Sequence, residues 1–120
     1  MELKYIESNN KITIAELTDG NFVISQAQDI LDIFGNLMFE DCDRLIIHER
    51  SLHTDFFDLK TKLAGDILQK FSNSRVKLAI VGDFAKYNSK SLQDFITESN
   101  KSNTVFFTDT FDTAFQKLEK

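Results

Sequence analysis

The sequence predicts an α/β layer sandwich, in which a central mixed β-sheet carries an antiparallel N-terminal hairpin and about four helices. The first observation is a pair of β-patterned segments, Leu3 to Glu7 and Lys11 to Leu17, whose connecting turn is too short for a parallel return. The second is a pair of continuous apolar runs, Leu45 to Ile47 and Val76 to Val81, typical of strands covered on both faces. The third is an amphipathic helix pattern between and after these runs. Together they give the order β-β-(β)-α-β-α-β-α-β-α, which we expect to form a single α/β domain (residues 1–120).

The first helix is expected to follow a short extended piece at Phe22 to Ile24 and to run from Ser25 to about Phe39. Ser25 and Gln28 have the spacing of a capping box, in which two side chains satisfy backbone amides of the first helical turn. Gly35 either lies inside this helix or marks its end. The spacing of the apolar residues predicts a buried stripe made of Ala27, Ile30, Leu31, Phe34 and Met38.

The centre of the chain is a buried strand, a polar corner and a second helix. The strand covers Arg44 to Glu49, the corner covers His48 to Asp58, and the helix runs from about Leu59 to Phe71. We expect Gly65 to allow this helix to approach the sheet closely. Its apolar residues recur with a helical period and form the stripe Leu63, Ala64, Ile67, Leu68 and Phe71.

Two further helices flank a last strand at Thr104 to Phe107. Either Ser89 or Ser91 caps the third helix, which extends to about Asn100 and buries Leu92, Phe95 and Ile96. Either Asp109 or Thr110 caps the fourth helix, which buries Phe111, Ala114, Phe115 and Leu118.

Composition argues against several classes of function. The net charge of −5 and the lack of a basic cluster argue against binding to nucleic acid or to an anionic membrane surface. Cys42 is the only cysteine, so an intrachain disulfide is excluded, and we expect a small buried side chain in a reducing compartment. No apolar run approaches the roughly 20 residues that a membrane-spanning helix needs, and the N-terminus lacks a signal-peptide pattern. A cytoplasmic protein without a membrane partner is therefore expected.

Polar residues gather where the parallel strands are predicted to end, which is where open α/β sheets bind ligands and partners. Three corners meet this condition: His48 to Asp58, Gly82 to Ser89, and Thr108 to Thr110. Capping and turn residues crowd strand ends in any such fold, so a purely structural role is the alternative interpretation. The candidate binding residues are Arg50, Ser51, His53, Thr54, Asp83, Tyr87 and Asp109.

The sequence predicts no catalytic residue, no metal site and no cofactor. His48, Glu49, His53, Asp55 and Asp58 could be written as a set of metal ligands, but their spacing matches no H-E-x-x-H helix and no cysteine pair supports them. There is no G-x-S-x-G nucleophile elbow, and the four glycines stand apart instead of forming a phosphate-binding loop. A response-regulator receiver domain needs an early acidic pair and a lysine after its last strand, and neither is present.

The order of elements, with a polar corner before the second helix, resembles the sulphate-transporter and anti-sigma-factor-antagonist (STAS) fold. In the antagonists of that fold, a Ser or Thr at the start of the second helix is phosphorylated, usually within a D-S-S-G-type motif. The corner here reads ERSLHTD and departs from that pattern, because it lacks the serine–glycine motif. Ser51 and Thr54 are its only hydroxyl side chains, so the resemblance implies one of these two as the phospho-acceptor. At the start of a helix, unpaired amides and the helix dipole would stabilise a phosphate. The alternative is that Thr54 serves only as a helix cap.

A closer resemblance rests on three separated strings, DFFDLKTKLAGDILQKF, KLAIVGDF and SKSLQDFITESNK. In their order and spacing they are similar to the bacterial family catalogued as domain of unknown function 4180, over roughly Ile12 to Leu118. The resemblance implies a cytoplasmic bacterial protein. It provides no catalytic residue, because the family has none assigned.

Two functions of different classes are compatible with these patterns. The first is a non-catalytic regulatory or protein-interaction module that docks an unidentified protein partner at the His48–Asp58 corner. The second is a small-molecule binder or small enzyme that uses the crevice at the ends of the strands. We also expect a homodimer, because Phe39, Phe56 and Phe57 lie at element edges where a small domain leaves apolar surface exposed.

Overall fold

The computed structural model describes all 120 residues and confirms the layered α/β class. One sheet contains β1 (Leu3–Glu7), β2 (Thr13–Leu17), β3 (Arg44–His48), β4 (Lys77–Val81) and β5 (Val105–Thr108). The four α-helices are α1 (Gln28–Phe39), α2 (Leu63–Ser74), α3 (Lys90–Lys101) and α4 (Phe111–Leu118). None of them is long and apolar enough to cross a membrane.

The strands lie in the sheet in the order in which they occur in the chain, β1-β2-β3-β4-β5. The first pair is antiparallel, as the short turn predicts, and each later strand pairs in parallel with the one before it. Three successive crossovers therefore advance in one direction across the sheet. Because parallel crossovers share one hand, they place α1, α2 and α3 on the same face. This topology is compatible with the STAS-like arrangement.

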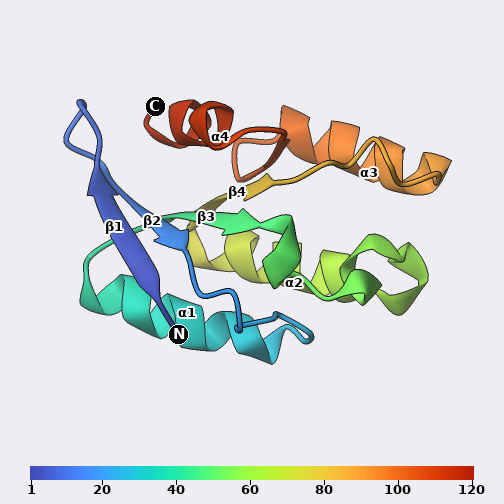
Figure 1. Ribbon diagram of the computed structural model, residues 1–120, viewed down its shortest axis with the longest axis horizontal. Helices are drawn as coiled ribbons and strands as arrows, with labels where there is room; N and C mark the ends of the chain where they lie inside the picture. The colour runs from blue at the N-terminus through green and yellow to red at the C-terminus, as the bar shows by residue number, and fades with distance from the viewer.

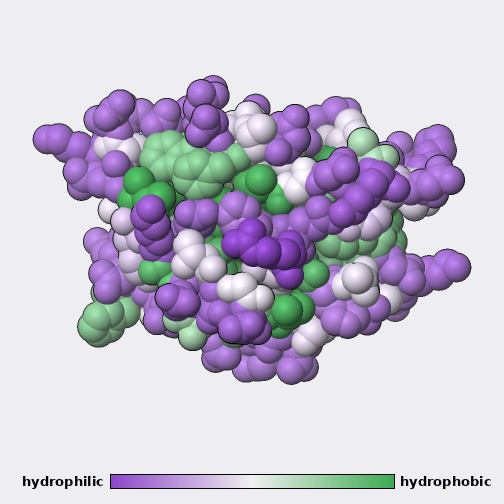
Figure 2. Space-filling model, in the orientation of Figure 1, coloured by the Kyte–Doolittle hydropathy of each residue, from purple (hydrophilic) through white to green (hydrophobic).

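The two faces of the sheet are covered unequally (Figure 1). The larger core contains 24 buried residues and lies between the sheet and the helices α1, α2 and α3. The strand side chains that point to this face, such as Leu45 and Ile47, belong to it. The opposite face has a core of only six, in which Ile46 and its neighbours pack under Ala114 and Leu118 of α4. The side chains that flank this smaller core are only partly buried, and Figure 2 shows hydrophobic surface in this region. The partly buried residues there are Ile12, Val81, Phe111 and Phe115.

The first helix differs from the prediction in its start and in its buried face. No side chain caps it in the predicted Ser25–Gln28 box; instead, the carboxylate of Asp29 accepts the backbone N–H groups of Ser25 at 2.9 Å and Gln26 at 3.2 Å. The Asp carboxylate is the stronger acceptor near the positive helix end. The buried residues are Ile30, Ile33 and Leu37, so the stripe predicted through Leu31 and Met38 is wrong.

The second helix begins at Leu63, four residues later than predicted. Leu59–Thr61 form a separate 3-10 turn, in which the Asp58 side chain accepts the backbone N–H of Lys60 at 3.1 Å. Lys62 then adopts a left-handed conformation (φ 67°), which interrupts the helical path. The predicted stripe of α2 is confirmed at Leu63, Ala64, Ile67 and Phe71. Gly65, however, faces open space, so the close approach predicted there is wrong.

The remaining helices begin at predicted caps, but Phe95, Phe111 and Phe115 are only partly buried, unlike the prediction. Ser89 caps α3 by accepting the N–H of Leu92 at 3.2 Å, and Thr110 caps α4 by accepting the N–H of Thr113 at 3.1 Å. The extended piece before α1 makes a single parallel bridge, Ile24 to Leu52, outside the sheet. Cys42 is buried as predicted, and that burial raises the pKa of its thiol.

Candidate functional site

The corner after β3 is tied to the loop after β4 by one carboxylate. Glu49 is the first residue after β3, and its Oε1 accepts the backbone N–H of Asp83 at 3.1 Å. Its Oε2 lies 2.7 Å from Nζ of Lys86 and accepts the hydroxyl of Tyr87. The Glu49 side chain is 18% exposed, so these donors replace most of its water. Adjacent parallel strands bring the two predicted corners together, as expected.

We call the contacts of Glu49 with Asp83, Lys86 and Tyr87 the junction. The protonation states of its side chains Glu49 and Tyr87 do not change around neutral pH. Burial raises the pKa of Glu49, but the bonds from Lys86, Tyr87 and the Asp83 amide outweigh it and hold the pKa below its usual range. Burial and the Glu49 carboxylate together raise the pKa of Tyr87 far above its usual value. The carboxylate stays ionised and the phenol stays protonated, so this pair is a structural link and has no proton to exchange near neutral pH.

Aromatic rings fill the space beneath the junction. Tyr87 stacks on Phe57 with ring centres 4.5 Å apart and planes 11° apart. Phe57 lies 5.9 Å from Phe84, which meets Phe107 edge-on at 5.2 Å. Phe57 and its neighbour Phe56 are buried, so of the three phenylalanines expected at element edges only Phe39 is exposed. The rings form a solid floor for the crevice between the two corners.

Gly82 permits the close approach of the two corners. A Cβ atom at this position would lie 2.7 Å from Cβ and from Oε1 of Glu49, and 3.0 Å from the ring of Phe84. Any larger residue would push the carboxylate away from its three donors. The sequence analysis places Gly82 in a turn, but no pattern in the sequence reveals that Glu49 lies against it.

An open hollow of about 410 Å³ remains above this floor. Of the predicted binding residues, Arg50, Thr54 and Tyr87 line it, together with Lys86. We call these four residues the strand-end surface. Arg50 is exposed and makes no ion pair, whereas Lys86 is paired with Glu49. The full lining consists of Glu49, Arg50, Leu52, Thr54, Phe57, Lys86 and Tyr87.

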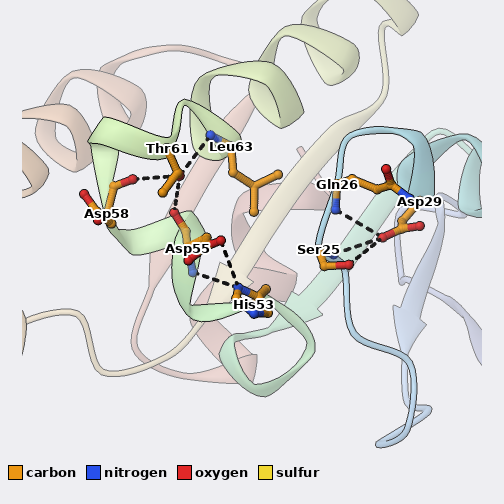
Figure 3. A network of polar contacts seen from close by, with 8 residues as sticks. All are labelled: Ser25, Gln26, Asp29, His53, Asp55, Asp58, Thr61 and Leu63. Atoms are coloured by element: carbon orange, nitrogen blue, oxygen red, sulfur yellow. Dashed lines mark hydrogen bonds and ion pairs between the residues drawn. The ribbon is translucent and has the colours of Figure 1, made fainter.

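The other predicted binding residues lie elsewhere. Ser51 is 1% exposed, and its hydroxyl has no hydrogen-bond partner. His53 uses its ring Nδ1 to accept the backbone N–H of Asp55 at 3.0 Å (Figure 3), which makes it the cap of a 3-10 turn. Asp83 and Asp109 share a second hollow of about 460 Å³ at the ends of β4 and β5. This second hollow is also lined by Phe84, Asn100, Phe106, Thr113 and Lys117, among others.

The structure places neither predicted phospho-acceptor at the start of α2. Thr54 is exposed and begins the 3-10 turn Thr54–Phe57, and Ser51 lies in the turn before it. The helix-dipole argument therefore fails for both. Thr54 does not cap α2, whose N-cap residue is Lys62, and His53 caps the 3-10 turn that Thr54 begins. The hydroxyl beside α2 is that of Thr61, which accepts the N–H of Leu63 at 3.3 Å and lies 2.6 Å from the carbonyl oxygen of Asp55 (Figure 3).

The carboxylates and imidazoles considered as metal ligands point in different directions. His48 lies on the α4 face of the sheet, where its Nε2 is 2.6 Å from a carboxylate oxygen of Glu16. Glu49 is held by its three donors, and His53 pairs with Asp55 at 3.6 Å. No group of three or more His, Cys, Asp or Glu residues is placed to hold a metal ion.

Asn100 has a role that the sequence analysis misses. Its amide oxygen accepts the backbone N–H of Phe107 at 2.7 Å, and its amide nitrogen donates to the carbonyl oxygen of the same residue at 3.3 Å. The last turn of α3 thereby provides hydrogen-bond partners for the backbone groups at the free edge of β5. Ser99 contributes as well, because its hydroxyl donates to the carbonyl oxygen of Val105. This closes one edge of the sheet against pairing with another chain. The sequence pattern that could have indicated this role is a polar residue in the last turn of a helix that directly precedes a strand.

Comparison with known proteins identifies a family and no individual relative. No curated protein matches the chain, and no solved structure does. The family model described as "Domain of unknown function (DUF4180)" matches residues 9–118, which is nearly the whole sequence and agrees with the range that the three strings predict. The chain therefore belongs to the DUF4180 family.

Proposed function

We propose that the protein is a non-catalytic regulatory module that docks a protein partner on the strand-end surface. The observation that carries the proposal is the engagement of Glu49 by Asp83, Lys86 and Tyr87. These bonds and the aromatic floor close the crevice in which an open α/β sheet places its ligands. What remains is an open hollow whose one carboxylate, Glu49, is held by its three donors and whose hydroxyls are those of Thr54 and Tyr87.

The chemistry of this surface favours an acidic segment of the partner. Arg50 is exposed and has no carboxylate partner within the chain, and its guanidinium can bind a carboxylate through two parallel hydrogen bonds. Lys86 is half exposed, at 52%, and adds positive charge to the same hollow. The buried rings below it, with Tyr87 at the rim, provide the rigid support that an interface needs.

The proposal is tested by charge reversal at Arg50. Quantitative mass spectrometry compares the proteins captured from a lysate by the native protein, by Arg50→Glu and by Lys4→Glu. Lys4 is an exposed lysine on β1 that makes no ion pair, so it controls for the change of charge. We expect a defined set of partners to be lost with Arg50→Glu and retained with Lys4→Glu. Equal capture by all three proteins would contradict the proposal.

A second candidate function rests on the hollow at Asp83 and Asp109. Its volume of about 460 Å³ is within the range of about 300–1,000 Å³ that holds small molecules. Its apolar rings and two carboxylates, which outnumber the single cation Lys117 in the lining, suit a cationic, partly apolar ligand. A thermal-shift screen of amines and metabolites tests this function, because a ligand that binds only the folded state raises the melting temperature. A shift that disappears in Asp109→Asn would support it, and the absence of any shift would exclude it for the compounds tested.

A further inference from the structure

The largest exposed apolar side chains of the protein lie together at the C-terminal end of α1. Phe39 is 88% exposed and Met38 is 80% exposed, and they are consecutive in the sequence. Figure 2 shows a green group protruding at the lower left, in the region where Figure 1 places this end of α1. Exposure of a whole phenyl ring is costly in water, and adjacent exposed apolar residues indicate an interface.

A hollow lies directly beside these two residues. It has a volume of about 540 Å³ and is bounded by the ends of α1 and α2 and the start of β3. Its lining is about half apolar, and Met38 belongs to it, whereas Phe39 does not. The patch therefore combines the protruding ring of Phe39 with a recess that the neighbouring Met38 lines. The lining residues are Met38, Asp41, Cys42, Asp43, Ser74 and Val76.

Charges of both signs surround the hollow. Its lining includes the carboxylates of Asp41 and Asp43, and Asp43 is paired with Arg44 at 2.7 Å. Glu40 follows Phe39 directly, and Arg75 lies between two lining residues, Ser74 and Val76. Both residues are exposed, and Arg75 directly follows α2. Neither Glu40 nor Arg75 takes part in any ion pair of the structure. A twofold axis that passes between Glu40 and Arg75 places each of them against the other on a second copy, because the same patch meets itself.

We propose that two copies of this chain associate across a twofold axis near Met38, with the Phe39 ring of each copy seated in the hollow of the other. Glu40 of each copy then faces Arg75 of the other across the rim. This surface lies at the starts of β3 and β4, whereas the strand-end surface lies at their ends. Dimerisation and partner docking are therefore independent, and a failure of one leaves the other intact.

The experiment measures mass in solution by light scattering coupled to size exclusion, at concentrations from micromolar to hundreds of micromolar. The native protein is expected to reach twice the 13.8 kDa of a single chain. Phe39→Asp is expected to remain a monomer throughout, with an unchanged melting temperature for the monomer, because the ring contacts little within its own chain. Val23→Asp is the matched control, since Val23 is 44% exposed and lies outside the patch.

Charge exchange gives a second measurement of the same contact. Glu40→Arg and Arg75→Glu are each expected to weaken the dimer at least tenfold, and the double variant is expected to restore it, because the pair is then reversed. A native protein that stays monomeric at hundreds of micromolar overturns the proposal. So does a dimer that survives Phe39→Asp, or one that Val23→Asp disrupts to the same extent.

Discussion

The carboxylate of Glu49 accepts the phenolic hydroxyl of Tyr87, a residue 38 positions later in the chain. This contact joins the corner that follows β3 to the loop that follows β4, and the same carboxylate also binds Lys86 and the Asp83 amide. Three donors from one loop thus converge on one acceptor from another. The junction determines the shape of the strand-end surface, because Arg50 and Tyr87 lie on either side of it.

Removing the hydroxyl of Tyr87 is expected to destabilise the protein. Tyr87→Phe retains the stack on Phe57 but leaves Glu49 without one donor. A hydrogen bond to a charged group contributes about 1.5–3 kcal/mol, and we expect a loss of that order in the free energy of unfolding measured with urea. Tyr5→Phe is the control, because the hydroxyl of Tyr5 makes only a long, exposed contact of 3.4 Å. An equal effect of both changes would contradict a special role for the junction.

The junction also predicts a dependence of stability on pH. The pKa of Glu49 is lower in the folded protein than its usual value of 4.5, so the folded state binds this proton more weakly than the unfolded state does. The stabilisation is therefore complete above pH 4.5 and is lost as the pH falls through the lower pKa of the folded state. Glu49→Gln has no such proton. We expect the difference in urea midpoint between the native protein and Glu49→Gln to shrink as the pH falls below 4.5, and a constant difference would contradict this.

The glycines differ sharply in their tolerance of a methyl group. Gly82→Ala places a Cβ 2.7 Å from Glu49, and we expect a loss of about 1–3 kcal/mol in the free energy of unfolding. Gly65→Ala meets nothing within 4 Å inside α2, and we expect a gain of about 0.5–1 kcal/mol because alanine favours the helix. Thermal unfolding of the two variants measures both changes, and the melting temperature should fall for Gly82→Ala and rise for Gly65→Ala. A stabilising Gly82→Ala would mean that Glu49 can move without cost.

Asn100 is expected to protect the edge of the sheet. Asn100→Ala removes both hydrogen bonds to Phe107, each worth about 1 kcal/mol. Asn100→Asp keeps the acceptor for the N–H of Phe107 and loses only the donor, so it separates the two contributions. Hydrogen exchange should be faster at the Phe107 amide in the alanine variant and close to native in the aspartate variant. Unchanged exchange in both variants would show that the edge is closed by other contacts.

Phosphorylation of Thr54 is expected to act through the charges of the hollow. Thr54 shares the strand-end surface with Arg50 and Lys86, and a phosphate carries close to two negative charges at neutral pH. Such a group would occupy the positive charges that an acidic partner needs. Thr54→Asp is therefore expected to reduce partner capture, and Thr54→Ala to leave it unchanged, at equal melting temperature. Equal capture by both variants would remove Thr54 as a switch.

The sequence predicts the elements that depend on local chemistry. Apolar alternation and short turns are sufficient for the hairpin, and hydroxyl caps are sufficient for the starts of α3 and α4. The start of α2 is mispredicted because Lys62 adopts a left-handed conformation that lysine rarely takes, and nothing in its own spacing signals this. The buried face of α1 is mispredicted because Met38 and Leu31 look like core residues in the pattern. Whether they are buried depends on how far the sheet extends beneath α1, and the spacing of apolar residues carries no information about that.

The candidate site is predictable only in its location. Topology brings the corners after β3 and β4 together, and three of the predicted residues, Arg50, Thr54 and Tyr87, share one hollow. Ser51 is buried by a tertiary contact, since its carbonyl accepts the N–H of Ile24 from a distant segment. The central role of Glu49 depends on three donors from another loop. Contacts of this kind are set by packing between elements and have no local signature.

The match between strand order and chain order bears on how the protein is made. A ribosome releases the N-terminus first, so each strand emerges when its neighbour is already available, and the sheet can grow by addition at one edge. The helix α4 follows the last strand of the sheet in the sequence, and it is the helix that packs over Ile46, Ala79 and Phe106. A nascent chain that ends before Phe111 thus holds a nearly complete sheet with one bare apolar face. Until the residues of α4 emerge from the ribosome and fold onto this face, its apolar side chains remain in contact with water.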